Sequence, residues 1–211
     1  MARAAVEFLA EHQLQFAGGL VVAERHEHAP HPHLRLHVGD HPIPGARSLA
    51  CANAIAALAD DVADGDVVIA LLSGGTSALI GAPVEGVRAE DLAALNTILL
   101  GSGLPIRATN AVRKRFAKWG AGRLALAFGP SAIHPVILSD VVGDDPIDIA
   151  SGPVSPDPLS AAQVEQLLRE TELARHLPLS MAAYLGAVRH GDRPETSKPG
   201  SPALEIGRAH V

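Results

Sequence analysis

The sequence is poor in cysteine, aromatic residues and long apolar runs. Its single cysteine, Cys51, excludes an intrachain disulfide framework and is typical of a reducing compartment. No run reaches the roughly 18 apolar residues that a membrane-spanning helix needs. The net charge of −6 argues against a broad nucleic-acid interface, because phosphate backbones are bound by clustered cations. Aromatic residues make up only 3%, so the core must consist mostly of alanine, valine, leucine and isoleucine.

Apolar residues nevertheless form 47% of the 211-residue chain and charged residues 19%, which is typical of one large globular domain. The polar, proline-rich stretch 190–204 is predicted to be a linker or surface loop. Helical patterns alternate with short apolar runs, which predicts an α/β fold with a largely parallel sheet and helices on both faces. We expect helices at 2–13, 46–61, 89–100, 106–119, 159–171 and 178–189, and strands at 20–23, 34–38, 67–72, 124–128 and 133–138.

A loop rich in glycine and hydroxyl groups follows the strand expected at 67–72. That strand is continuously apolar, which is typical of a strand covered on both faces. Glycines let backbone N–H groups approach an anion, and hydroxyls add donors, so the loop could cradle a phosphate or carboxylate. It equally suits an ordinary turn that caps the next helix, and it lacks the Gly-Lys-Ser/Thr of a P-loop. The loop consists of Ser73, Gly74, Gly75, Thr76 and Ser77.

Cationic and amide side chains gather on the helix expected at 106–119. Asn110, Arg113 and Lys114 share one helical face at spacings of three and four residues. Lysine is scarce in this chain, yet Lys114 and Lys118 lie one turn apart, where an anionic ligand could use their charge. A solvated basic face is the alternative interpretation, since most charge runs have that role.

Acidic residues follow the strand expected at 133–138, where open α/β sheets place ligand chemistry. Asp140, Asp144 and Asp145 could hold Mg²⁺ together with substrate phosphates, or pair with Arg113 and Lys114. One of them could instead act as a base for a substrate hydroxyl. An aspartate-rich turn without chemistry is the remaining alternative.

Histidines are concentrated between His26 and His41, which contain six of the eleven in the chain. A transition-metal site needs ligands that are fixed by structure and supported by further partners. Prolines interrupt this segment and no cysteine joins it, so we expect a surface loop and a strand there.

Three of these motifs together resemble the glycerate 2-kinase family, some members of which carry the older name hydroxypyruvate reductase. The resemblance covers roughly residues 1–204, and agreement of three motifs in order makes it specific. Two shorter segments, beginning at His41 and Glu195, resemble further parts of the family. The three motifs are Ser73-Gly-Gly-Thr-Ser-Ala-Leu, Asn110-Ala-Val-Arg-Lys, and Ser139-Asp-Val-Val-Gly-Asp-Asp continuing through Ser151-Gly-Pro to Pro156-Asp-Pro.

The resemblance implies ATP-dependent phosphorylation of D-glycerate at its 2-hydroxyl, with Mg²⁺, in the cytoplasm. It implies a Rossmann-like α/β domain and a second, smaller domain. The expected partners are D-glycerate and ATP, not nucleic acid or membrane, and a homodimer is left open. The implied catalytic residues are Asp140, Arg113 and Lys114, the implied metal ligands are Asp140, Asp144 and Asp145, and the implied substrate- and nucleotide-binding residues are Ser73, Gly74, Gly75, Thr76, Ser77, Asn110, Ser139, Ser151 and Gly152.

The sequence also departs from the family pattern. Gly45 stands where the family usually has an aspartate, and Gly120 stands where it usually has a lysine, unless Lys118 substitutes. Met1-Ala2 resembles the Met-Ala that follows a family Gly-Lys-Ala motif, whose lysine is thought to be catalytic, and the resemblance stops near Leu204. We therefore expect a fragment that lacks both the strand carrying that lysine and the second domain. Residues 205–211 are expected to be a non-native tail. The rival functions are a hydroxypyruvate-type oxidoreductase and a non-catalytic anion-binding domain.

Overall fold

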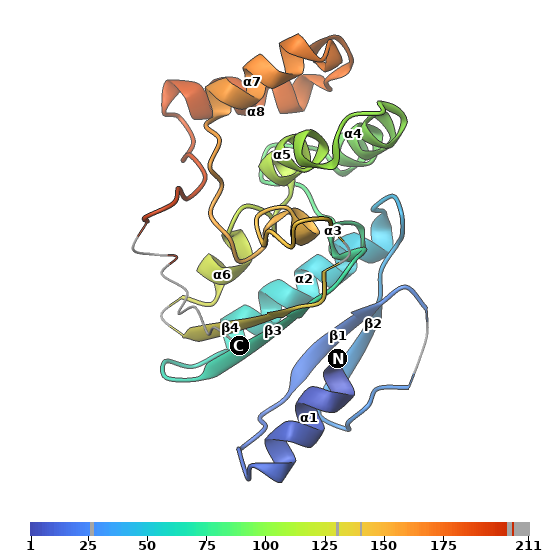
Figure 1. Cartoon of the computed structure of the whole chain (residues 1–211), viewed down its shortest axis with the longest axis vertical. Helices are drawn as coiled ribbons and strands as arrows, with labels where there is room; N and C mark the ends of the chain where they lie inside the picture. The colour runs from blue at the N-terminus through green and yellow to red at the C-terminus, as the bar shows by residue number, and fades with distance from the viewer. Residues whose placement is uncertain (26–27, 130, 140, 202–203, 205–211) are drawn as a thin grey trace.

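The computed structural model describes residues 1–25, 28–129, 131–139, 141–201 and 204. These residues form a helical half stacked on a strand half (Figure 1). The helical half comprises α4 (Ala89–Gly101), α5 (Ile106–Phe116), α7 (Ala161–Glu170) and α8 (Leu179–His190). The strand half comprises α1 (Ala2–Glu11), β1 (Gly19–Ala23), β2 (Leu34–Val38), α2 (Ala46–Asp61), β3 (Val67–Leu72), α3 (Thr76–Leu79), α6 (Arg123–Ala127) and β4 (Ala132–Ile137). Two short 3-10 helices are η1 (Ile149–Ser151) and η2 (Leu173–His176).

The expected α/β class with parallel strands is confirmed. β1 pairs with β2 in parallel, and β3 pairs with β4 in parallel, from Val67 opposite Ala132 to Leu72 opposite Ile137. Within the described residues the strands form two separate two-stranded ladders, not one sheet. α2 links the two ladders: its Cys51, Ala52 and Ile55 share a core with Leu72, and Leu20 and Val22 of β1 pack against the same core.

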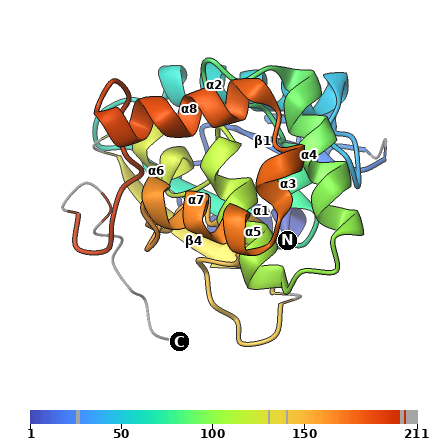
Figure 2. The ribbon, with the colours of Figure 1, turned by 90° about the horizontal axis from the view of Figure 1, so that it is seen from above.

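The helical half has a closed core of its own. Viewed from above, its four helices lie over the strands (Figure 2). Local sequence fixes their ends. Ser160 and Gln163 form a reciprocal capping box at the start of α7, and Gly191 adopts the left-handed conformation that ends α8. The best-buried side chains of this core belong to Leu92, Leu95, Leu99, Val112, Phe116, Val164, Leu168, Met181 and Leu185.

Residues 124–127 belong to α6 and Phe128 is its C-cap, so the strand predicted at 124–128 is wrong. Gly122, at φ 78°, provides a left-handed residue immediately before α6. The amides of Leu124 and Ala125 donate to the carbonyl of Pro153, which gives this turn partners outside itself. Four or five apolar residues fit a strand or a buried helical turn equally well, and the tertiary contact decides between them.

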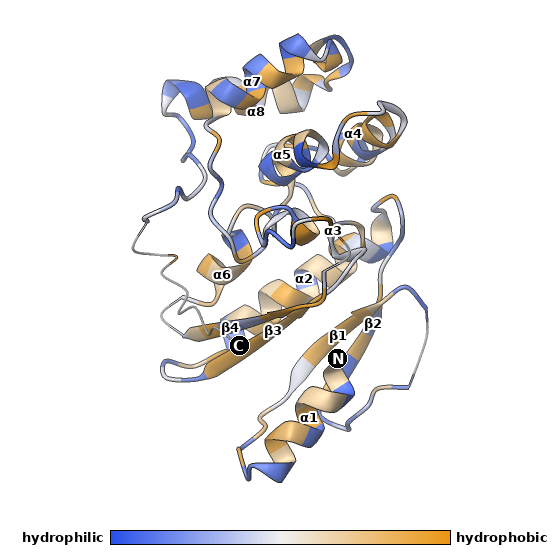
Figure 3. Ribbon diagram, viewed as in Figure 1, coloured by the Kyte–Doolittle hydropathy of each residue, from blue (hydrophilic) through white to orange (hydrophobic). Residues whose placement is uncertain are grey.

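The strand β3 is covered on one face only in the described structure, so the prediction that both of its faces are covered is wrong. Val68, Ala70 and Leu72 face the core of α2, together with Ile133 and Ile137 of β4. β3 is apolar along its length (Figure 3), and Val67 and Ile69, which alternate with the residues facing the core, are exposed. The outer face of the β3–β4 ladder presents Val67, Ile69, Val136 and Leu138. None of the helices in the described part of the chain has the length and apolar character to cross a membrane.

Candidate functional site

The glycine loop (residues 73–77) and the acidic segment (the third motif, residues 139–158) meet beyond the carboxyl end of β3. The Oγ atoms of Ser77 and Ser151 lie 2.9 Å apart and form a hydrogen bond between segments distant in sequence. Gly75 adopts φ 80°, a left-handed conformation that a side chain would strain. Thr76 donates from its hydroxyl to the carbonyl of Ser73 at 2.7 Å, which closes the turn. Two of the three motifs therefore form one site.

The third motif, on α5, holds the acidic segment in place. Asn110 donates from Nδ2 to the carbonyl of Asp148 at 2.7 Å, and Lys114 donates from Nζ to the carbonyl of Ile147 at 2.7 Å. Both side chains are buried. Burial lowers the pKa of Lys114, and the nearby carboxylates of Asp157, Asp148 and Asp145 oppose that shift only in part. These contacts identify Asn110 and Lys114 as the residues that anchor the acidic segment to α5.

Arg113 differs from its two neighbours on the same face of α5. Burial lowers the pKa of its guanidinium. Its Nε is buried and has no hydrogen-bond partner within the part of the chain that the structure describes. A mostly buried cation of this kind is suited to an anionic ligand, because a counter-charge would offset the cost of its desolvation.

The acids of the segment are placed differently from one another. Asp145 accepts the amide of Ile147 at 3.1 Å on Oδ1, and Arg107 lies 2.9 Å from Asp148 and 3.7 Å from Asp145. Asp144 is exposed in a left-handed turn, at φ 49°. The Ser139 hydroxyl donates to the carbonyl of Val141 and accepts from its amide, each at 3.1 Å.

The metal site stays a prediction. Asp140, the residue expected to be both catalytic and metal-binding, lies outside the described residues. Among the residues that are described, no group of three histidine, cysteine, aspartate or glutamate side chains could hold a metal ion.

An open pocket of about 340 Å³ adjoins the glycine loop, lined by Glu24, His41, Gly74, Gly75 and Leu79. Glu24 follows β1, His41 follows β2 and the glycines follow β3, so the pocket lies at the carboxyl ends of three parallel strands. Ligands of open α/β folds bind at such edges. Sequence reasoning did not select Glu24 or His41 as site residues, although their position after two expected strands was a usable signal.

The loop that carries His41 is fixed to α2. Asp40 accepts from the first-turn amides of Arg47 and Ser48 at 2.9 and 3.3 Å, and its own amide donates to the hydroxyl of Ser48 at 2.9 Å. Asp40 thereby caps the helix from outside. A Cβ on Gly45 would lie 2.8 Å from Asp40 Oδ2, so the Asp40 carboxylate would have to shift to accommodate a side chain there.

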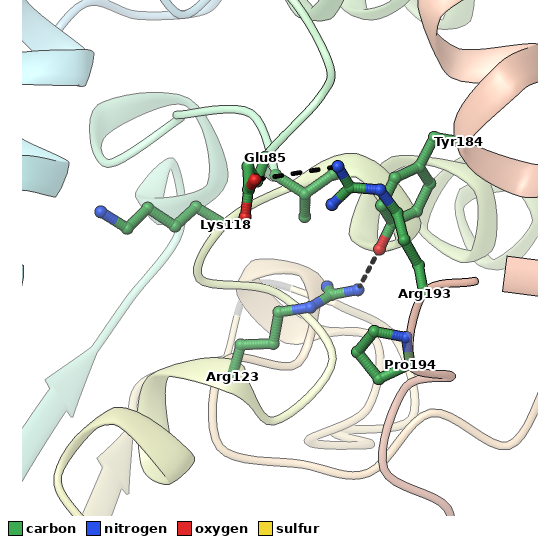
Figure 4. Close-up of a pocket in the computed structure, with 7 residues that line it drawn as sticks. Glu85, Lys118, Arg123, Tyr184, Arg193 and Pro194 are labelled. Atoms are coloured by element: carbon green, nitrogen blue, oxygen red, sulfur yellow. Dashed lines mark hydrogen bonds and ion pairs between the residues drawn. The ribbon is translucent and has the colours of Figure 1, made fainter. Parts of the chain in front are cut away.

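A second hollow, of about 220 Å³, lies between the two halves (Figure 4). The cationic side chains that line it already interact with other groups of the protein. Arg123 donates to the carbonyls of Lys114, Ala117 and Gly120 and to the hydroxyl of Tyr184. The Lys118 ammonium points away from the hollow and lies 4.9 Å from the centroid of the Trp119 ring. Arg123 therefore supports the backbone after α5.

A buried ion cluster ties residues 195–198 to α5, so the prediction that 190–204 is only a linker or surface loop is wrong for this part. Arg115 has no exposed side-chain surface and pairs with Asp157 at 3.1 Å and with Glu195. Thr196 donates to Asp157 at 3.0 Å. Burial raises the pKa of Glu195, but amides of Ala161 and Thr196 and the Arg115 guanidinium outweigh that effect and lower the pKa to about 2.

Comparison with known proteins gives relatives that are named either as glycerate kinases or as hydroxypyruvate reductases. A protein of Agrobacterium vitis, provisionally named a hydroxypyruvate reductase, is 42% identical over 63% of this chain and 35% of the relative. The D-glycerate 2-kinase of Thermotoga maritima is 34% identical over 81% of this chain and 40% of the relative. A crystal structure of glycerate kinase from the same organism superposes with a TM-score of 0.82 at 30% identity, over 100% of this chain and 47% of that one.

The chain thus spans less than half the length of these relatives. A family model described as a domain of unknown function, DUF4147, matches residues 1–186. The chain belongs to the DUF4147 family, and its relatives include proteins named as glycerate kinases.

Proposed function

We propose that this chain is the substrate-binding part of a kinase that transfers a phosphoryl group from ATP to the 2-hydroxyl of D-glycerate. The observation that carries the proposal is the hydrogen bond between Ser77 and Ser151, which joins two motifs while α5 anchors the segment between them. The names of the relatives supply the substrate and the reaction class.

The proposed roles follow from what phosphoryl transfer demands. The reaction is catalysed mainly by positioning and by neutralising charge on phosphate oxygens. The glycine loop, Ser73 to Ser77, supplies amide and hydroxyl donors for an anionic group, together with Ser151 and Gly152. Arg113 offsets ligand charge. Lys114 and Asn110 keep the acidic segment against α5, and Asp140 orients the reacting hydroxyl.

Magnesium has a weaker basis than ATP. Asp145 and Asp148 are engaged by Arg107, and the described carboxylates form no group that could hold an ion alone. The residues described here do not fit a protein-held metal, and no step of the proposal passes through one.

The proposal extends to the parent protein and its location. Residues 1–204 would be part of its larger α/β domain, with a smaller second domain completing the enzyme and 205–211 lying outside the native sequence. The uncovered apolar face of β3–β4 supports a larger protein, because parallel strands normally have both faces covered. The buried free thiol of Cys51 is compatible with the cytoplasm.

A hybrid enzyme tests the function. Residues 1–204 would replace the matching part of the Thermotoga maritima D-glycerate 2-kinase, and the product would be assayed with ATP plus D-glycerate and with NADH plus hydroxypyruvate. We expect phosphorylated glycerate and no NADH oxidation. Oxidation of NADH without any need for ATP would replace this proposal by the reductase activity. A folded hybrid that shows neither reaction would favour a non-catalytic anion-binding domain.

A further inference from the structure

The pocket beside the glycine loop contains two side chains that the proposed reaction has not yet used. Glu24 and His41 come from different loops, but both line the same pocket as Gly74 and Gly75. His41 is in close contact with the loop, since a Cβ on Gly75 would lie 3.3 Å from its Nε2. An imidazole nitrogen and the glycine backbone are thus presented to the same small space.

The position of His41 is fixed by its neighbours. Asp40 is bonded to the first turn of α2 through both its carboxylate and its amide. Gly39 lies so close to the backbone of Leu79 that a Cβ there would be 2.3 Å from the Leu79 carbonyl oxygen. His41 is exposed, and the backbone immediately before it is fixed by Gly39 and Asp40, so the loop loses less conformational freedom when a ligand binds.

The lining of the pocket distinguishes between ligands. Among the described residues that line the pocket, Leu79 is the single apolar side chain, so this lining does not offer the apolar and aromatic walls that bind a nucleobase. The Glu24 carboxylate would repel a polyphosphate, whereas it accepts readily from a hydroxyl. The His41 imidazole and the backbone amides of the glycine loop, which line the same pocket, suit a single carboxylate. These groups fit a small hydroxy acid better than a nucleotide.

We propose that Glu24 and His41 form the hydroxy-acid subsite of this protein, in which His41 and the glycine loop bind the carboxylate and Glu24 accepts from the terminal hydroxyl. This inference rests on the proposed function and names the residues that select its substrate. It assigns the pocket to D-glycerate and leaves ATP to another part of the site.

Direct binding to the 211-residue chain tests the assignment. D-glycerate, D-lactate and ATP would be titrated by calorimetry and by imidazole NMR signals. D-lactate retains the carboxylate and the 2-hydroxyl but lacks the terminal hydroxyl. Loss of one hydrogen bond to a charged group should weaken binding about tenfold to a hundredfold. His41→Gln should therefore weaken both acids, whereas Glu24→Gln should weaken D-glycerate alone and remove the preference over D-lactate.

Matched controls are available outside the pocket. His33 lies in the exposed loop before β2, and Glu7 lies on α1. Neither His33→Gln nor Glu7→Gln should change the binding of D-glycerate or D-lactate. Unchanged D-glycerate affinity in both pocket variants, weakened ATP binding instead, or no D-glycerate binding by the folded wild-type chain would each overturn the assignment.

The hybrid enzyme separates this failure from failure of the proposed function. If His41→Gln and Glu24→Gln raise KM for D-glycerate and leave KM for ATP unchanged, both proposals stand. If the hybrid is a kinase and neither substitution changes its KM for D-glycerate, the assignment of Glu24 and His41 to the subsite is wrong and the kinase assignment stands.

Discussion

The helical half and the strand half of this molecule differ in how completely they bury their apolar residues. Val112, Phe116 and Met181 in the helical half are 0% exposed, whereas Val67 and Leu138 on the outer face of the β3–β4 ladder are each 63% exposed. The strand half also carries the glycine loop, His41 and the open pocket. The helical half therefore buries its apolar side chains more completely, whereas the strand half leaves an apolar outer face and an open pocket.

The largest predicted effect tests the connection of α5 to the segments around it. Arg115→Met would leave Asp157, which is 1% exposed, as a buried carboxylate without its cation. Removing one partner of such a pair costs roughly 3–5 kcal/mol. Urea unfolding should show this loss at an unchanged m-value. Arg175→Met, which removes an exposed pair with Glu172, is the control and should cost less than about 1 kcal/mol. Equal losses in the two variants would contradict the importance of the buried cluster.

The next prediction compares the two halves directly. Leu185→Ala in the helical core, where the side chain is 1% exposed, should lower the free energy of unfolding by about 2–5 kcal/mol. Val136→Ala on the outer face, where the side chain is 51% exposed, should cost less than about 1 kcal/mol. Chemical denaturation measures both. A large loss for Val136→Ala would show that this face is covered in solution, and sedimentation would then reveal whether a second copy covers it.

A glycine pair tests whether the strand half is specialised for binding. Gly75→Ala and Gly65→Ala both place a side chain at positive φ, of 80° and 91°, and should each cost about 1–2 kcal/mol. Gly65 has no neighbour within 4 Å of an added Cβ, whereas Gly75 faces His41. Only Gly75→Ala should therefore weaken D-glycerate binding in calorimetry. Equal binding by both variants would remove the glycine loop from the site.

The smallest effect concerns pH. The pKa of Glu195 is about 2 in the folded chain and 4.5 ordinarily, so its contribution to stability is present above pH 4.5 and is lost as pH falls toward 2. Glu195→Gln should be less stable than wild type at pH 7, and the difference should shrink below pH 4.5. About a third of the side chain is exposed, so solvent screening keeps the effect modest. Thermal unfolding at pH 7 and pH 3 measures it, with Glu172→Gln as the exposed control. A difference that is constant with pH would contradict the low pKa.

The order of elements was largely predictable because most of them carry strong local patterns. α2, β2 and β3 begin and end where the sequence indicated. The error at 124–128 arose because a short apolar run is compatible with both periods, and the carbonyl of Pro153 selects the helix. The uncovered face of β3 could not be predicted. An apolar run shows that both faces of a strand favour burial, but it does not show whether another element covers each face.

The candidate site was predictable in part. The resemblance of three motifs to one family implied that the glycine loop, α5 and the acidic segment act together, and Ser77 does contact Ser151. The sequence could not show that Asn110 and Lys114 anchor the acidic segment. Both donate to backbone carbonyls, and a backbone acceptor cannot be recognised from the type of side chain at its position. His41 and Glu24 were missed because contacts between loops depend on how the two ladders are placed by α2.

The cap that Asp40 provides for α2 links the pocket to hydrogen exchange. The amides of Arg47 and Ser48 are held by the residue next to His41, so we expect the first turn of α2 and the pocket loop to open together. A ligand that contacts His41 binds only the closed form and must slow exchange at these two amides by the same factor by which it favours closure. Two backbone protons outside the pocket thereby become reporters of its occupancy, readable without any enzymatic assay.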